Sequence, residues 1–299
     1  MVTPSLSPSV TSLPNTAIFS PILLPTPVEI SPTAEELSPT VQDASPTPDF
    51  TFEPTIAETP QPVPTLIPLA TTALTAIPQP SADAGAIQIF GPGPQSKIVS
   101  PLNIYGYAIP GYKDKGRVDL YGEDGRLVAS QILQLNTAYK WAYFYWPLPF
   151  KISSAGELGR LTMSTQDKYG RINALYSIHL LLLPEGSSIV TPPGNLRERC
   201  VIVQPVAGQR ISGGVLSVSG KMLPFNNLPL TVQLIDRDGN VANSQLVALS
   251  AAGDNYAPFR VDIPYRISKG TWELLVVSQF DDRIGGLMYL YSQEIFINP

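Results

Sequence analysis

The chain has 299 residues, with 24 acidic and 19 basic side chains, one histidine and one cysteine, and a formal net charge of −5. A single cysteine excludes an internal disulfide, and a single histidine excludes a metal site built from several histidines. Residues 1–85 contribute −8 and the rest of the chain only +3, which is too little for a nucleic-acid-binding surface.

Residues 1–85 hold 17 of the 32 prolines and no Lys or Arg. A segment so rich in Pro, Thr and Ser cannot bury enough apolar surface to offset the entropy of ordering it, so we expect a disordered stalk. Its densest apolar run, residues 17–24, is interrupted by Pro21 and is shorter than the ~20 residues of a membrane span. It also lacks the features of a secretory signal.

Segments of this composition usually hold a module away from a surface, and we therefore expect an extracytoplasmic protein. On this interpretation an export signal or a membrane anchor lies upstream of Met1. The alternative is a cytoplasmic protein with a low-complexity tail.

From residue 86 onward the sequence repeats itself at an offset of 114. Residues 118–131 match residues 232–245, and both stretches carry alternating apolar residues around an Asp-Gly pair, which predicts a β-hairpin. A constant offset through turn and core positions indicates a duplication, so both copies should share one fold. Further matches are Leu102 with Leu216, Gly106 with Gly220, Leu161 with Leu275 and, after a slip of one residue, Leu175 with Leu290.

Short β-rich segments follow one another at roughly ten-residue intervals, and no stretch carries a sustained helical period. We therefore predict an all-β protein of two tandem immunoglobulin-like Greek-key β-sandwiches, residues 86–185 and 199–299, joined by a linker at 186–198. The expected strands are 86–90, 102–108, 116–121, 127–135, 142–145, 157–165 and 172–183 in the first copy, and 201–204, 215–221, 230–235, 241–249, 259–263, 270–278 and 287–297 in the second.

Strand alternation also predicts which side chains form the two cores. Cys200 opens an apolar stretch, and we interpret it as a small buried side chain at a strand start. The residues expected to point inward are Ile104, Val118, Leu120, Leu161, Met163 and Ile178 in the first copy, and Val218, Val232, Leu234, Leu275 and Val277 in the second.

Each copy resembles the immunoglobulin-like domain of bacterial spore-germination and related cell-envelope proteins. The resemblance lies in residues 98–108 (IVSPLNIYGYA), in the two Asp-Gly hairpins, and in residues 256–263 (YAPFRVDI) and 270–277 (GTWELLVV). It covers about two thirds of the chain, and its motifs are structural. The second copy departs from the pattern, with Gly214-Val215 in place of the Ser100-Pro101 of the first. The resemblance implies an extracytoplasmic adhesion or assembly module without activity of its own.

Nothing in the sequence predicts an enzyme, a cofactor or a metal site. His179 lies in an apolar strand, and no nucleophile or orienting acid is evident beside it. The acidic stretch 236–240 lacks the glutamate that closes a calcium loop, so a hairpin turn explains it better. Asp281 and Asp282 could hold a cation, but we expect a solvated acidic turn.

The most suggestive cluster is the aromatic run at residues 139–150, which has a far less aromatic counterpart at residues 255–259. Alternation places Trp141, Tyr143 and Tyr145 on one face of a strand, with Phe144 and Trp146 on the other. Exposed aromatic side chains can stack on sugars or anchor a protein interface, so Trp141, Tyr143, Tyr145 and Trp146 are the candidate ligand-binding residues. The alternative is that these side chains fill the first core and the contact with the second domain.

These observations favour a non-catalytic interaction, adhesion or assembly module of a bacterial cell envelope, displayed on a flexible stalk. The expected partner is an envelope protein or a glycan, and a membrane is involved only through the anchor expected upstream. A second possibility is a carbohydrate-binding module that uses the aromatic run. A third is an accessory subunit of an envelope enzyme or transporter.

Overall fold

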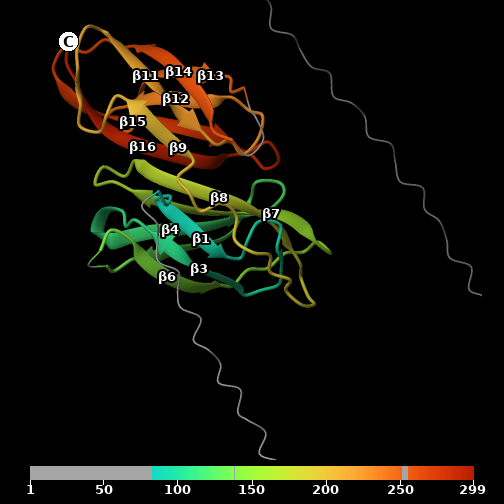
Figure 1. Cartoon of the computed structure of the whole chain (residues 1–299). Helices are drawn as coiled ribbons and strands as arrows, with labels where there is room; N and C mark the ends of the chain where they lie inside the picture. Colours follow the sequence, from blue (N-terminus) through green and yellow to red (C-terminus); the bar gives the residue numbers. More distant parts are fainter. Residues whose placement is uncertain (1–82, 138, 251–254) are drawn as a thin grey trace, which may run out of the picture. The chain divides into compact units, whose positions relative to one another are not determined.

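The computed structural model describes residues 83–137, 139–250 and 255–299. The stalk predicted for residues 1–85 thus lies almost wholly outside the described residues. Within them the chain is almost entirely β, and the one helical segment is the single 3-10 turn η1 (Tyr112–Asp114). None of the helices in this part of the chain has the length and apolar character needed to cross a membrane. Figure 1 shows the strands gathered into two groups that follow each other along the chain.

The first repeat is a sandwich of two sheets. One sheet has the strand order β1-β3-β6, and the other runs β8-β7-β4-β5, with β2 added to β8 in parallel. This order places the first, third and sixth strands opposite the rest, as in immunoglobulin-like sandwiches. The strands are β1 (Ile87–Gly91), β2 (Lys97–Ile98), β3 (Leu102–Ala108), β4 (Lys115–Tyr121), β5 (Leu127–Gln134), β6 (Ala142–Leu148), β7 (Glu157–Gln166) and β8 (Ile172–Leu182).

The second repeat has the same order of strands. The sheet β9-β11-β14 faces the sheet β16-β15-β12-β13, and β10 pairs with β16 in parallel. The prediction of two tandem immunoglobulin-like sandwiches is therefore confirmed. The strands are β9 (Cys200–Gln204), β10 (Arg210–Ile211), β11 (Val215–Met222), β12 (Leu230–Ile235), β13 (Val241–Val247), β14 (Ala257–Pro264), β15 (Thr271–Phe280) and β16 (Leu287–Ile297).

The two Asp-Gly hairpins form as predicted, between β4 and β5 and between β12 and β13. Gly125 and Gly239 have φ angles of +80° and +85°, a region that L-residues with a Cβ rarely adopt. The turns are closed by backbone bonds from Gly122 N to Arg126 O and from Asp236 N to Asn240 O, both 2.9 Å. The repeated motif is therefore turn and framework in both copies.

Every side chain predicted to point inward is buried. The largest exposure in that set is 4%, at Ile178. Cys200 is fully buried at the first residue of β9, so its interpretation as a core side chain is confirmed. Each sandwich accordingly has a continuous apolar interior, which the alternating strand pattern of the sequence specifies.

The two repeats belong to one compact unit because their last strands pair with each other. Strand β8 lies antiparallel to β16, which joins the two larger sheets into one sheet with the strand path β13-β12-β15-β16-β8-β7-β4-β5. Leu175 faces Leu290 in this seam. These two leucines are equivalent positions of the duplication, and antiparallel pairing centred on equivalent residues is what a two-fold axis produces.

The seam carries an apolar strip on the face of the shared sheet. Leu175 of the first repeat clusters with Leu274, Val276 and Leu290 of the second, all buried. The seam is therefore a packed interface as well as a row of backbone hydrogen bonds, and both contributions oppose independent motion of the two repeats.

The segment predicted as a linker, residues 186–198, is hydrogen-bonded to the first repeat. Ile189 exchanges backbone bonds with Lys97 of β2, 2.8 and 2.9 Å long. Thr191 accepts a bond from the amide of Gly93 and donates its hydroxyl to Pro94 O. The segment is thus laid along the sandwich rather than suspended between the two repeats.

Candidate functional site

Four tyrosines form the outer face of the smaller sheet of the first repeat. Alternation along β3 and β6 points Tyr105, Tyr107, Tyr143 and Tyr145 away from the core, and the register sets Tyr105 opposite Tyr145 and Tyr107 opposite Tyr143. Tyr105, Tyr143 and Tyr145 are 38%, 40% and 56% exposed, whereas Tyr107 is buried beneath its neighbours. We call these four residues the tyrosine face.

The rings of the tyrosine face are held by contacts on the sheet surface. Tyr107 meets Phe90 of β1 and Tyr143 of β6 edge to face, with ring centroids 5.7 and 5.5 Å apart. The ring of Tyr105 lies over Gly91, where an added Cβ would come within 2.1 Å of it. These contacts fix the rings without a ligand, which lowers the entropy cost of binding to them.

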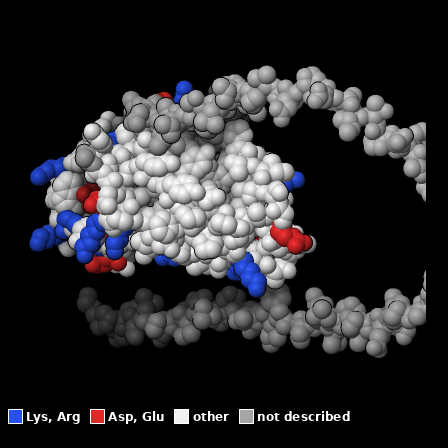
Figure 2. All heavy atoms as spheres, turned by 90° about the horizontal axis from the view of Figure 1, so that it is seen from below, with Lys and Arg blue, Asp and Glu red and all other residues white. Residues whose placement is uncertain are grey.

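The tyrosine face is polar at its hydroxyls but carries no charge. Burial raises the pKa of Tyr143, and the neighbouring phenols of Tyr105, Tyr107 and Tyr145 raise it further. Tyr145 donates its hydroxyl to Asn103 Oδ1 at 3.1 Å. Figure 2 views the molecule from the side on which β6 lies in Figure 1 and shows a broad central area without acidic or basic side chains.

The structure divides the four residues suggested by the aromatic run. Tyr143 and Tyr145 lie together on the outer face, as alternation predicts. Trp141 precedes β6, and its indole N–H donates to Gly85 O at 3.2 Å. The ammonium group of Lys140 lies over the indole ring, 4.3 Å from the ring centroid. Trp146 has the inward parity of the buried Phe144, yet remains 38% exposed. Among the described residues, none of these four makes a hydrogen bond or ring contact across the seam.

The corresponding face of the second repeat has a different chemistry. The register of β11 with β14 places Ser219, Lys221, Pro258 and Arg260 where the first repeat has Tyr105, Tyr107, Tyr143 and Tyr145. Both sandwiches fold with the same strand order, so the fold does not require aromatic side chains at these positions. The tyrosine face is therefore a property of one repeat and a candidate for its specific function.

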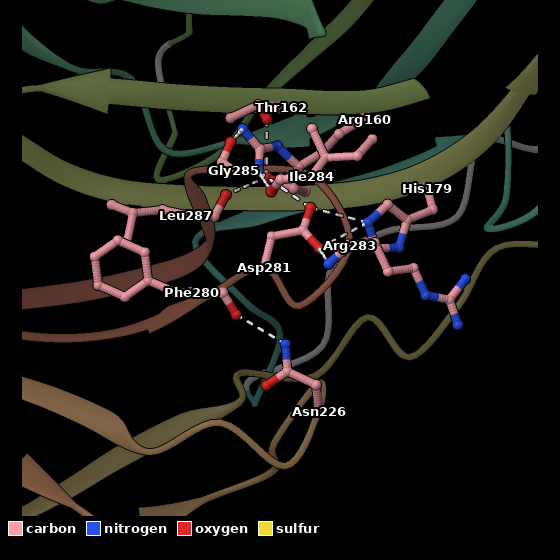
Figure 3. Close-up of polar contacts among 11 residues, drawn as sticks. Arg160, Thr162, His179, Asn226, Phe280, Asp281, Arg283, Ile284, Gly285 and Leu287 are labelled. Atoms are coloured by element: carbon pink, nitrogen blue, oxygen red, sulfur yellow. Dashed lines mark hydrogen bonds and ion pairs between the residues drawn. The ribbon is translucent and has the colours of Figure 1, made fainter. Parts of the chain in front are cut away.

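A second cluster of polar side chains lies at the seam, and the sequence did not reveal it. Asp281 was predicted to be a solvated acidic turn, but its side chain is fully buried, because Arg160 of β7 extends across the seam to it. Figure 3 shows the carboxylate of Asp281 between Arg160 and His179. Arg160 Nη1 lies 3.1 Å from Asp281 Oδ2, and His179 Nε2 lies 2.9 Å from the same oxygen.

The rest of the Asp281 loop supplies further partners for the two Nη atoms of Arg160, whereas its buried Nε has no hydrogen-bond partner in the described residues. Its guanidinium donates to Ile284 O and Gly285 O, each at 2.8 Å, and lies 4.9 Å from the ring centroid of Tyr121. Gly286 has a φ of +118°, and a Cβ there would come within 2.5 Å of Arg160 Nη2, so glycine permits this approach. Two charges removed from water in this way need such a set of partners.

The cluster at the seam, formed by Arg160, His179 and Asp281, consists of side chains that bind one another. Burial raises the pKa of the Asp281 carboxyl, but the amide N–H of Arg283 and the His179 ring outweigh it, and the net pKa is lowered. The hydrogen bonds of the described residues bring no serine or cysteine side chain to His179. A nucleophile–histidine–acid arrangement needs that contact. No partner for His179 was evident in the sequence, and the structure supplies one: on the face of β8 opposite the buried Ile178 and Leu180, its ring contacts Asp281 of the other repeat.

A second arginine of the first repeat binds the other repeat as well. Arg171 forms an ion pair with Asp167 at 2.7 Å and donates to Ile235 O and Asp236 O at 3.2 Å, and it reaches Glu294 Oε1 at 3.2 Å. Arg160 and Arg171 thus fix the seam through carbonyl oxygens and carboxylates of the second repeat.

The hairpin acids do not form a cation site in the described residues. Asp236 accepts bonds from the amides of Asp238 and Asn240 at 2.9 and 2.8 Å, which is the role of an aspartate in a turn. The described part of the chain holds no group of three or more His, Cys, Asp or Glu side chains suited to a metal ion.

The comparisons with known proteins concern the fold alone. No family model and no curated protein matches the chain. Solved structures that are similar include red sea bream transglutaminase (10% identity, TM-score 0.28), which covers 71% of this chain and 31% of its own. The titin domains Z1Z2 in complex with telethonin have 14% identity and a TM-score of 0.18, and the match covers 72% of this chain and 96% of the titin chain. A marsupial T cell receptor has 8% identity and a TM-score of 0.22, and the match covers 71% of this chain and 73% of the receptor chain. The chain thus spans under a third of the transglutaminase, and the immunoglobulin-like fold stated above rests on strand order and register.

Proposed function

We propose that this chain is a non-catalytic interaction module of a bacterial cell envelope, displayed outside the cytoplasm on its Pro/Thr/Ser-rich N-terminal segment. The observation that carries the proposal is the tyrosine face, which is present on one repeat and replaced by polar and charged residues on the other. Partly exposed, pre-organised aromatic side chains are the groups that most often dominate binding energy at interfaces.

The buried ionisable groups support a non-catalytic role. Asp281 and Arg160 bind each other across the seam, and His179 binds Asp281. Glu157 is bound by Arg126 and by Ser154. The joining of the two sandwiches and the closing of hairpins explain the positions of these four groups, which supports the proposed non-catalytic role.

The extracytoplasmic location is proposed from the sequence. A proline-rich segment without basic residues before two β-sandwiches is typical of a module held away from a surface. The resemblance of each repeat to the immunoglobulin-like domains of bacterial spore-germination and envelope proteins, described above, also favours this location. On this proposal the second repeat and the seam hold the tyrosine face on a rigid support.

The test uses the full chain and an envelope fraction of the native host. We expect the protein to co-sediment with isolated envelopes, and the variant Tyr143→Ser/Tyr145→Ser to remain in the supernatant. The matched control is Lys221→Ser/Arg260→Ser, which alters the equivalent face of the second repeat and should leave sedimentation unchanged. Equal sedimentation of all three proteins, or recovery of the native protein from the cytoplasm, would contradict the proposal.

A further inference from the structure

The tyrosine face has a chemistry that selects one class of ligand. Its exposed positions combine aromatic rings with neutral hydrogen-bonding groups, namely the phenols of Tyr105, Tyr143 and Tyr145 and the amide of Asn103 of β3. None of the outward positions of β1, β3 and β6 carries a charged side chain. The equivalent face of the second repeat has Lys221, Arg260 and Asp262.

The shape of this surface adds a second constraint. It is the outer surface of a three-stranded sheet, and the hollows found among the described residues are lined by other side chains. Helices and polyproline segments are usually bound in grooves, whereas a sheet surface with partly exposed rings can accept an extended polymer laid across it. The side-chain rings lie on adjacent strands, so a chain crossing the strands would meet them one after another.

We infer that the tyrosine face binds an extended, uncharged polysaccharide. The inference rests on the proposed function and names its ligand. The C–H faces of a sugar ring suit the negative π-face of a tyrosine, and the sugar hydroxyls suit the phenols and amides beside it. The central area of the face in Figure 2 has no acidic or basic side chain. A surface without charge is complementary to an uncharged polymer.

Exposure suggests a division of roles among the rings. Tyr145 is the most exposed of the four, at 56%, and Tyr143 and Tyr105 follow at 40% and 38%. Tyr107 is buried between Phe90 and Tyr143 and supports the others. Tyr143 and Tyr145 therefore make the contacts with the polysaccharide, and Tyr107 positions Tyr143.

The experiment measures binding of the full chain to neutral polysaccharides. Co-sedimentation with insoluble chitin and cellulose, and calorimetric titration with chitohexaose, give the affinity. Polygalacturonate serves as an anionic probe. We expect binding to at least one neutral polymer that is insensitive to salt, and a loss of about tenfold or more for Tyr143→Ser/Tyr145→Ser. Lys221→Ser/Arg260→Ser should bind like the native chain.

Two further variants keep the inference open to refutation if the double serine variant unfolds. Tyr145→Ser alone removes the most exposed ring, and Tyr143→Phe/Tyr145→Phe keeps both rings but removes their hydroxyls. Stacking predicts that the phenylalanine variant binds better than Tyr145→Ser. Thermal unfolding of each variant confirms that it is folded.

Three outcomes would overturn the inference: no binding to any neutral polymer, equal binding by the native chain and Tyr145→Ser, or salt-sensitive preference for polygalacturonate. If neutral polysaccharides fail while envelope sedimentation still depends on Tyr143 and Tyr145, the ligand is an envelope protein. The polysaccharide inference then falls and the proposed function stands. If envelope sedimentation is also independent of both tyrosines, the proposed function falls as well.

Discussion

Replacing Asp281 by Asn tests whether the seam ion pair holds the two repeats together. The substitution keeps the size of the side chain, and its amide oxygen can take the place of Oδ1, which accepts bonds from the amide of Arg283 and from His179. It removes the negative charge that lies 3.1 Å from Arg160 Nη1. The guanidinium, whose side chain is only 4% exposed, then has no opposite charge.

Removing one partner of a buried ion pair costs about 3–5 kcal/mol, because the remaining charge stays out of water. Arg160 keeps its bonds to Ile284 O and Gly285 O, so we expect a loss near the lower end, about 3 kcal/mol. For a folded unit of this size the melting temperature should fall by about 6–12 °C. The double variant Arg160→Met/Asp281→Leu should regain much of the loss, since it removes both buried charges.

The assays are urea and thermal unfolding of the full chain, together with hydrogen exchange of β8 and β16. The control is Asp124→Asn, which removes an even shorter ion pair with Arg126, 2.8 Å long, from an exposed hairpin and should leave stability unchanged. Hydrogen exchange should rise first at the β8–β16 pairing in the Asp281 variant and nowhere in the control.

The pH dependence measures the other contacts of Asp281, those with the amide of Arg283 and with His179. The pKa of Asp281 is lowered in the folded chain, so its contribution is present above the ordinary carboxyl pKa and is lost as the pH falls through the lower folded value. The stability difference between the native chain and Asp281→Asn should therefore shrink below pH ~4. A difference that is absent at neutral pH, or that does not diminish in acid, would refute this account of the seam.

Three further predictions concern residues away from the seam pair. Burial raises the pKa of the Cys200 thiol well above its usual range, so iodoacetamide should label Cys200 only after unfolding; labelling of the native chain would contradict its burial. Burial and the nearby Asp236 raise the pKa of Glu273, whose Oε2 has no hydrogen-bond partner. The cost of burying ionised Glu273 grows as the pH rises through its folded pKa, so Glu273→Gln should raise the melting temperature at pH 7 but not in acid. An equal effect at pH 7 and in acid would contradict this explanation. Gly125→Ala and Gly239→Ala should each cost about 1–2 kcal/mol in urea unfolding, because both glycines have positive φ angles; a neutral result at either would exclude strain there.

The parts of the fold that depend on local sequence could be predicted. Alternation along residues 118–120 and the Asp-Gly pair that follows specify a strand, its buried face and its hairpin, because each signal lies within a few residues of its effect. The duplication then carried the same interpretation to the second repeat. Strands β2 and β10 were not predicted, because two residues are too few to show a period.

The seam could not be predicted because its partners are distant in sequence. Arg160 and Asp281 are 121 positions apart, and only the pairing of β8 with β16 brings them together. An aspartate beside a second aspartate in a turn has the local pattern of a solvated acid, and burial by another repeat leaves no mark on that pattern. The tyrosine face shows the same limit: alternation places Tyr143 and Tyr145 on one side of β6, but adding Tyr105 and Tyr107 requires the pairing of β6 with β3.

The internal two-fold symmetry seen in the pairing of Leu175 with Leu290 bears on how many tyrosine faces each molecule displays. Two identical subunits related by a two-fold axis must display every surface twice, whereas a duplicated chain with the same internal symmetry can change one copy alone. Here the described residues carry tyrosines on one copy and serine, proline and basic residues on the other. Each molecule therefore offers a single tyrosine face, and any avidity must come from several whole molecules arrayed side by side.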